Sequence, residues 1–116
     1  MVFILDDEPL NIAALRRVIE SNGWQAAGAT TLDDAIASVR GKAVDLFIIN
    51  PVMPDGHGPD RAKRLLEQSP NARVLYISGY PAETLIALGI DLSCGSFLQK
   101  PLDFACLCQT IERLIT

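Results

Sequence analysis

Cysteine is scarce in this sequence, and its few copies show no pairing pattern. Cys94, Cys106 and Cys108 form no CxxC motif, and their number is odd. Isolated cysteines of this kind are usually small, reduced core residues, whereas secreted domains and zinc sites use paired spacings. We therefore expect neither a disulfide nor a cysteine-ligated metal, and we expect a cytoplasmic location.

Long apolar runs and basic clusters are also missing. No apolar stretch approaches the roughly 20 residues of a membrane-spanning helix, and the opening MVFILDDEP turns acidic too early for a signal peptide. The net charge is −4 and lysine and arginine do not cluster, which argues against nucleic-acid binding. No GxGxxG follows the first apolar run and no Walker lysine is present, so a nucleotide site is not expected either.

The chain does contain short, unbroken apolar runs. With 116 residues, 49% of them hydrophobic, it suits one globular domain over residues 1–116. Runs without polar alternation are typical of strands that are covered on both faces, as in a parallel sheet. Strands are therefore predicted at 2–5, 46–49, 74–77 and 97–98, with a weaker candidate at 24–29.

Helical patterns fill the gaps between these runs. Pro9 suits a first helical turn and Gly23 a helix end, while Thr31 with Asp34 resembles a capping box. Strand and helix thus alternate five times, which predicts a doubly wound α/β sheet with ligands at the carboxyl ends of its strands. The predicted helices run from Pro9 towards Gly23, from Thr31 to Arg40, from Pro59 to Pro70, over 82–88 and over 103–115.

Polar side chains follow four of the predicted strands. Asp6 and Asp7 follow the first, and Asn50, Ser78 and Lys100 follow the others. Carboxylates are ligands that Mg²⁺ prefers, and a hydroxyl and an ammonium can hold phosphoryl oxygens. Each residue also has a plain structural explanation as a helix cap, a turn residue or a solvated charge. Their shared position at one sheet edge favours phosphoryl-transfer chemistry.

These motifs resemble those of a known family. ILDDEP, DLFIINPVMPDGHG, VLYISGY and FLQKP match, in order and spacing, the receiver domain of two-component response regulators and hybrid histidine kinases. The resemblance covers nearly the whole chain and implies a flavodoxin-like (βα)5 fold with strand order 2-1-3-4-5. It also implies a cis Lys100–Pro101 peptide bond. The last third of the chain most resembles receivers attached to hybrid sensor kinases.

The resemblance assigns roles to the residues at the sheet edge. It implies that Asp7 binds Mg²⁺ directly, that Asp6 binds it through water, and that the Val52 backbone carbonyl is a further ligand. It implies that Ser78 senses the phosphoryl group and that Lys100 pairs with it.

Further implications concern signalling and partners. Phe97 falls at the aromatic switch position, which couples the site to the face formed by the fourth helix, fifth strand and fifth helix, a possible homodimer surface. Val52 and Tyr80 fall where side chains control the water that hydrolyses the acyl phosphate. The implied partner is a histidine kinase or a histidine phosphotransfer protein.

Asn50 departs from the family pattern. It occupies the position of the phosphorylated aspartate, but a carboxamide is a poor nucleophile and carries no charge for the cation. Asp55 is no substitute, because it lies beyond Pro54 rather than at the strand end. Two interpretations stay open: a natural pseudo-receiver that signals by protein contacts, or an engineered substitution in a working receiver.

Other functions compete with this interpretation. A phosphorylation-independent interaction module overlaps with the pseudo-receiver. A phosphatase of the haloacid dehalogenase type would use Asp6, Ser78 and Lys100 in that order, but it needs another acidic motif after the lysine, where only Asp103 and Glu112 remain. The one histidine, His57, lies between two glycines and is predicted to be a turn residue rather than a phosphoryl donor. Receiver domains are regulatory, so we do not expect an enzyme.

Overall fold

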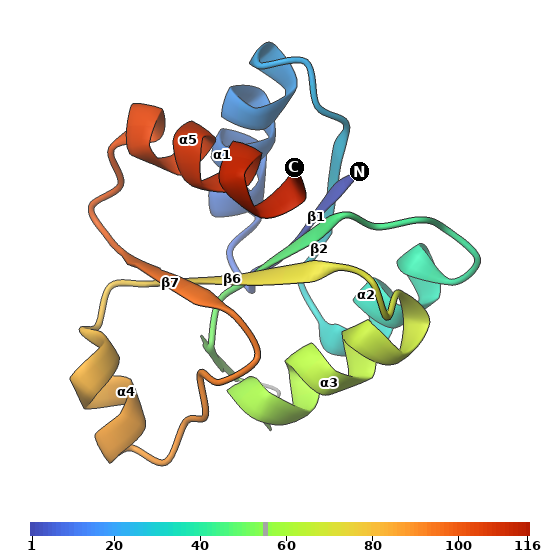
Figure 1. Ribbon diagram of the computed structural model, residues 1–116. Helices are drawn as coiled ribbons and strands as arrows, with labels where there is room; N and C mark the ends of the chain where they lie inside the picture. Colours follow the sequence, from blue (N-terminus) through green and yellow to red (C-terminus); the bar gives the residue numbers. More distant parts are fainter. Residues whose placement is uncertain (55) are drawn as a thin grey trace.

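The computed structural model describes residues 1–54 and 56–116, together with the side chains of all of these except 56–60. Strands and helices alternate along the chain, as Figure 1 shows. The elements are β1 (Val2–Leu5), α1 (Pro9–Ser21), β2 (Ala26–Ala29), α2 (Leu32–Val39), β3 (Leu46–Ile49), β4 (Val52–Met53), β5 (Gly56–His57), α3 (Gly58–Gln68), β6 (Arg73–Ser78), α4 (Ala82–Ala87), β7 (Ser96–Gln99) and α5 (Phe104–Ile115).

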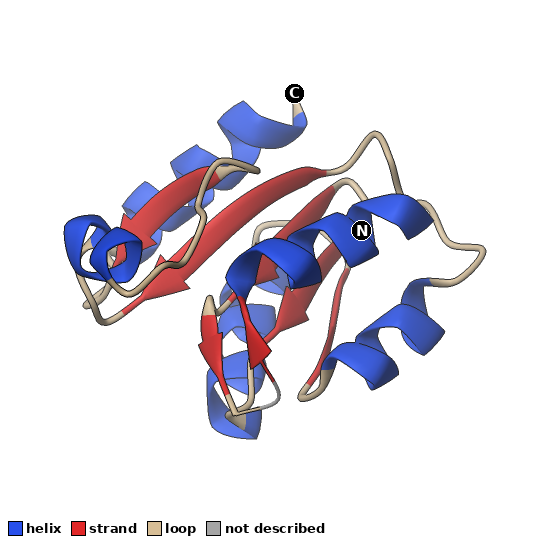
Figure 2. Ribbon diagram, turned by 90° about the horizontal axis from the view of Figure 1, so that it is seen from below, coloured by secondary structure: helices blue, strands red, loops and turns tan. Residues whose placement is uncertain are grey.

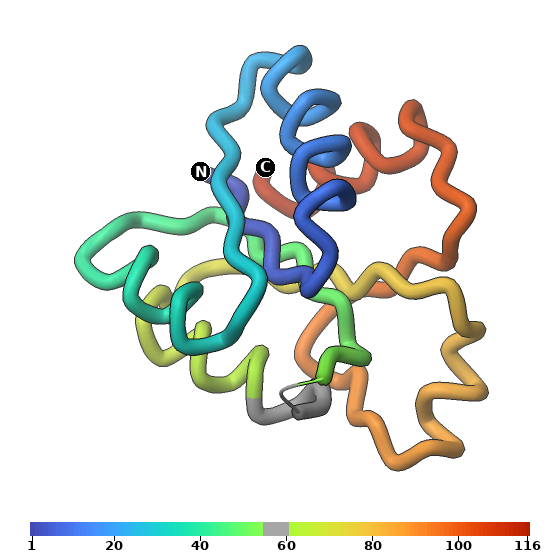
Figure 3. Tube along the Cα trace, turned by 180° about the vertical axis from the view of Figure 1, so that it is seen from behind, coloured from blue at the N-terminus to red at the C-terminus, as the bar shows by residue number. Residues whose placement is uncertain are grey.

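Five of the strands form one parallel sheet. Its order is β2-β1-β3-β6-β7, so the sheet strands, counted along the chain, follow the predicted order 2-1-3-4-5. The chain trace seen from behind shows β1 between β2 and β3 (Figure 3). The order reverses beside β1, which places the carboxyl ends of β1 and β3 at the point where such sheets bind ligands. The doubly wound α/β prediction is therefore confirmed.

Helices cover both faces of the sheet, as Figures 1 and 2 show. Because side chains alternate along a strand, Phe47 and Ile49 join the cluster packed by α2 and α3, whereas Leu46 and Ile48 join the one packed by α1 and α5. We call these the α2–α3 face and the α1–α5 face. Burial on both sides explains why the strands are unbroken apolar runs.

Several aromatic side chains pack on the α2–α3 face. Phe3 and Phe47 meet edge to face there, with ring centroids 6.3 Å apart. Tyr76 is fully buried on the same face, and this burial, followed by the nearby Cys94 thiol and Asp91 carboxylate, raises the pKa of its hydroxyl. Phe97 packs against this cluster while remaining partly exposed.

Helix ends follow the capping signals in the sequence. The Thr31 hydroxyl accepts the Asp34 N–H at 3.2 Å, as a cap of α2 should. Asp103 was predicted inside the last helix, but it lies one residue before it, where its carboxylate accepts the N–H groups of Ala105 and Cys106. The Lys100–Pro101 peptide bond is cis, as the family resemblance implies.

Several details were not predicted. The weak strand at 24–29 is shorter than expected, because only Ala26–Ala29 pairs with β1. β4 and β5, of two residues each, form a short antiparallel ribbon, visible as the two short arrows in Figure 2. No apolar run of greater length in the sequence predicts it. His57 was predicted to be a turn residue, but its backbone lies in β5; the predictions about Asp55 and about the His57 side chain lie outside what the structure describes. Within its described residues, no helix is long and apolar enough to cross a membrane.

Candidate functional site

The carboxyl edge of the sheet gathers most of the polar residues singled out in the sequence. Asp6, Asn50 and Lys100 line one pocket of about 230 Å³, together with Asn11 from α1. We call it the edge pocket. It continues below these polar groups onto the α1–α5 face, where apolar side chains line it, among them Ile4, Ile48, Ile77, Leu102 and Phe104.

Main-chain hydrogen bonds fix the strand ends relative to one another. The Asn50 N–H donates to the Leu5 carbonyl at 2.9 Å, and the Lys100 N–H donates to the Ser78 carbonyl at 2.7 Å. These bonds lie just past the last paired residues of the sheet, so they extend its regularity to the site. The positions of Asn50 and Lys100 are therefore set by the rigid sheet rather than by flexible loops.

The two acids after β1 have different environments. Asp6 is only 5% exposed, and its carboxylate accepts the Glu8 N–H at 2.9 Å and the Asn11 side-chain amide at 3.4 Å. Asp7 is less buried, and its carboxylate accepts a side-chain N–H of Asn50 at 3.3 Å. The N-cap residue of α1 is Glu8, so the simple interpretation of Asp7 as the helix cap does not hold.

Asn50 makes two different hydrogen bonds from one amide. Its nitrogen donates to Asp7, and its oxygen accepts the Val52 N–H at 3.1 Å, which closes a turn before β4. The side chain is half-buried at the end of β3. It therefore joins the loop after β1 to the loop after β3.

The remaining candidate residues are less closely gathered. The Ser78 hydroxyl accepts the Tyr80 N–H at 3.1 Å, within its own loop. Tyr80 is 53% exposed, and Val52 is half-buried in the short ribbon. Phe97 pairs with Tyr76 across β6 and β7, on the strand that leads to Lys100. The Ser78 carbonyl accepts the main-chain bond from Lys100, and among the described residues no hydrogen bond joins Ser78 to Asn50.

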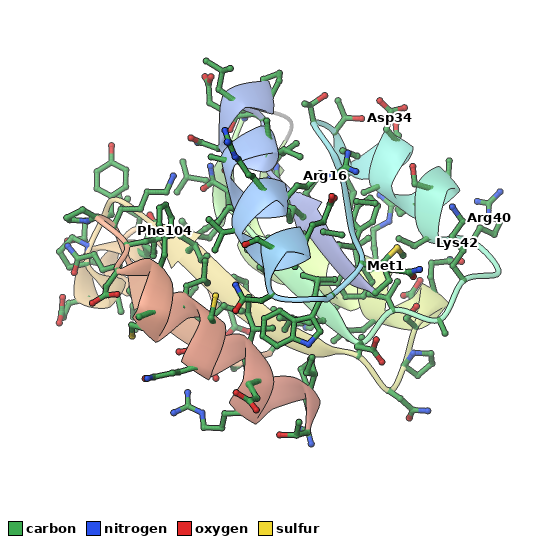
Figure 4. All side chains as sticks on the ribbon, turned by 90° about the horizontal axis from the view of Figure 1, so that it is seen from above. Met1, Arg16, Asp34, Arg40, Lys42 and Phe104 are labelled. Carbon is green, nitrogen blue, oxygen red and sulfur yellow. The ribbon has the colours of Figure 1, made fainter. Side chains whose placement is uncertain are left out.

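Sequence reasoning missed Asn11 and the apolar part of the edge pocket. Asn11 lies in the first turn of α1, five residues after Asp6. An amide at this distance from an acid at a strand end is the sequence feature that could have predicted the contact. The pocket depends on how α1 and the start of α5 lie over the sheet, which no local motif reveals. Figure 4 shows Phe104 at the start of α5, far from Met1 at the opposite edge.

The residue types only partly suit a magnesium ion. Two carboxylates and a backbone carbonyl are the hard oxygen ligands that Mg²⁺ takes. The Asn50 amide, however, points an N–H group at Asp7, the acid that the family pattern assigns to the metal. This N–H competes with a cation for one oxygen of Asp7, and the amide brings no negative charge of its own, so the residues fit Mg²⁺ less well than a set with an acid at position 50 would.

The chain matches known proteins along almost its whole length. Residues 2–112 match the family model of the response regulator receiver domain. The chain is 30% identical over 105 residues to the photosynthetic apparatus regulatory protein RegA of Rhodovulum sulfidophilum, covering 89% of this chain and 56% of that protein. It is 26% identical over 101 residues to the chemotaxis protein CheY of Thermotoga maritima, covering 86% and 84% of the two.

Solved structures agree with this match. The beryllofluoride-activated NtrC4 receiver domain dimer superposes with a TM-score of 0.82 at 26% identity, covering 98% of this chain and 94% of that one. The receiver domain of the hybrid histidine kinase CckA superposes with a TM-score of 0.81 at 23% identity, covering 99% and 98%, and supports the fold. The chain spans about half the length of the RegA protein that it matches.

Proposed function

We propose that this chain, which belongs to the response regulator receiver family, binds a histidine kinase or a phosphotransfer protein but accepts no phosphoryl group at position 50. The members of this family are regulatory domains that interact with such proteins. One observation carries the proposal: an amide, Asn50, directly follows β3 and lies beside Asp6, Asp7 and Lys100. The two acids and the lysine of a receiver site are retained beside it, and Ser78 ends the next strand of the sheet.

The chemistry of the amide prevents the usual modification. A receiver aspartate attacks phosphorus through a carboxylate oxygen and becomes an acyl phosphate. In Asn50 the corresponding oxygen is an uncharged carbonyl that accepts the Val52 N–H, and the nitrogen lone pair is delocalised. Neither atom is a competent nucleophile. Conversion to aspartate through a cyclic imide is also blocked, because the next residue, Pro51, has no N–H.

The neighbouring residues keep roles that an aspartate at position 50 would use. Asp6, Asp7 and the Val52 carbonyl are the ligands we propose for Mg²⁺, with an affinity weakened by the missing charge at position 50. Ser78 and Lys100 would hold the phosphoryl oxygens. Phe97, on the β7 strand that leads to Lys100, is the proposed switch residue.

Val52 and Tyr80 concern the lifetime of the modified state. Both are bulky and flank the loops after β3 and β6, so in an aspartate form they would keep the hydrolytic water out. We therefore expect a long-lived acyl phosphate on Asn50→Asp. Rapid autodephosphorylation of that variant would contradict this role.

Two exposed apolar surfaces could take partners. Leu10 in the first turn of α1 and Phe104 at the start of α5 are 80% and 51% exposed, and Phe104 lines the edge pocket. We propose that a helix of the kinase or phosphotransfer protein docks there. Ile86 and Leu88 at α4 are exposed on another side and support a homodimer through α4, β7 and α5.

A phosphorylation assay tests the proposal. The native chain, Asn50→Asp and Asn50→Ala are incubated with acetyl phosphate and Mg²⁺, and the mass of each intact protein is measured. We expect one added phosphoryl group on Asn50→Asp only, with Asn50→Ala as the control for modification elsewhere. A phosphoryl group on the native chain would overturn the proposal.

The same assay separates the competing functions. Modification of no variant would favour an interaction module that uses the fold but not its chemistry. The dehalogenase-type interpretation predicts instead that the native chain hydrolyses a phosphate ester and that Asp6→Ala abolishes this activity. The family match favours the regulatory function over both.

A further inference from the structure

The orientation of the Asn50 amide is fixed by its two partners. Asp7 is a carboxylate that only accepts hydrogen bonds, and the Val52 N–H only donates. The nitrogen of Asn50 must therefore face Asp7 and its oxygen must face Val52. Exchanging the two atoms would place two acceptors together at one end and two donors at the other.

A carboxylate at position 50 could not make the same pair of contacts. Its oxygen would still accept the Val52 N–H, but it would meet Asp7 as a second negative charge at about the present 3.3 Å. Two like charges at such a distance repel strongly unless a cation lies between them. The amide removes one charge and supplies a donor hydrogen in its place.

The second acid is satisfied by the protein as well. Asp6 accepts the Glu8 N–H and the Asn11 side chain, and it is almost completely buried. Buried carboxylates are stabilised by such hydrogen bonds. Each of the two acids therefore has at least one N–H partner from the chain itself.

We propose that the Asn50 amide takes the place of the cation, so that the loops after β1 and β3 are held in one arrangement whether or not Mg²⁺ is present. The inference rests on the proposed function for the position of the cation site. It adds that Asn50 is a structural bridge and not merely an inactive substitute. A partner that docks at the edge pocket then meets the same surface at any Mg²⁺ concentration.

Thermal unfolding with and without Mg²⁺ tests the bridge. The native chain, Asn50→Asp and Asn50→Ala are melted in chelator and in millimolar MgCl₂, with NaCl at matched ionic strength as a control for general salt effects. The native Tm should not respond to Mg²⁺. Asn50→Asp should melt below the native chain in chelator and recover with Mg²⁺, binding the ion at least about tenfold more tightly than the native chain. Asn50→Ala should melt lower in both.

The backbone amide of Val52 gives a second, local readout. Its NMR signal and hydrogen-exchange protection report the bond to Asn50 directly. We expect this signal to be unmoved by Mg²⁺ in the native chain, to move with Mg²⁺ in Asn50→Asp, and to lose protection in Asn50→Ala. The measurement on the native chain stands even if a variant fails to fold.

Two results would overturn the inference. One is a native chain that Mg²⁺ stabilises as much as it stabilises Asn50→Asp. The other is an Asn50→Ala variant that keeps the native Tm and the native protection of Val52. Neither result depends on a phosphodonor, so failure of the bridge can be distinguished from failure of the proposed function. An Asn50→Asp variant that binds Mg²⁺ but is never phosphorylated would contradict only the proposed function.

Discussion

The two faces of the sheet are covered differently near its carboxyl edge. On the α2–α3 face, Ala35 and Ala62 bring their helices close to the sheet and are themselves fully buried. On the α1–α5 face, Ala14 stays exposed and lines the edge pocket, which reaches down to Ile48. Small helix residues thus close one face and leave the other open. We therefore expect changes in side-chain volume to cost more stability on the closed face, whereas the open face leaves the site accessible to a partner.

The largest expected effect comes from truncating neighbouring residues of β3. Ile48 and Ile49 are the same residue type, both almost completely buried, on opposite faces of the sheet. Ile49→Ala should lower the free energy of unfolding by about 4 kcal/mol, and Ile48→Ala by nearer 2 kcal/mol, within the range for deleting a buried isoleucine. Ile48 already borders a pocket, so its removal creates less new cavity. Urea unfolding of both variants measures the difference.

Ile48→Val and Ile49→Val serve as the matched controls, because they remove one methylene and should preserve the same order with smaller losses. Equal losses for the two alanine variants would mean that the edge pocket closes in solution. The difference between the two faces would then have no energetic consequence.

Enlarging the small helix residues should have opposite effects on the two faces. Ala62→Leu forces extra volume into a fully buried position of α3 and should cost about 1–3 kcal/mol. Ala14→Leu points extra volume at the edge pocket and should be tolerated or slightly stabilising. Thermal melts of the two variants and of Ala13→Leu, an exposed control on α1, measure the contrast. A destabilising Ala14→Leu would show that no room exists there.

The fold was largely predictable because burial leaves a clear trace in this sequence. Residues 46–49 are uninterrupted LFII and form β3 with the predicted bounds, since both of their faces are covered. Ala26–Ala29 was harder, because an edge strand of alanine and glycine has little apolar signal. The β4–β5 ribbon was missed for a related reason: its strands have only two residues each, and the turn that leads into β4 depends on the Asn50 side chain rather than on hydrophobic pattern.

The site was predictable in its residues but not in its contacts. Motif positions at strand ends correctly brought Asp6, Asn50 and Lys100 to one pocket, because parallel strands end at the same edge. The partner of each atom depends on side-chain rotamers and loop geometry, which the sequence does not encode locally. The bond between Asp7 and Asn50 therefore came only from the structure, and so did the contact from Asn11 to Asp6.

The smallest expected effect concerns the helix caps on the two faces. Asp103 accepts two N–H groups at the start of α5, at 2.9 and 3.3 Å, whereas Thr31 accepts one at the start of α2. Both alanine variants should lose about 1 kcal/mol, with the larger loss for Asp103→Ala, because an N-cap leaves its N–H groups unsatisfied when it is removed. Asp103→Asn keeps the acceptor without the charge, and its urea midpoint should lie close to the native one. A larger loss for Thr31→Ala would mean that α2 depends more on its cap than α5 does, although α2 packs on the closed face. Packing would then no longer explain why the two faces differ.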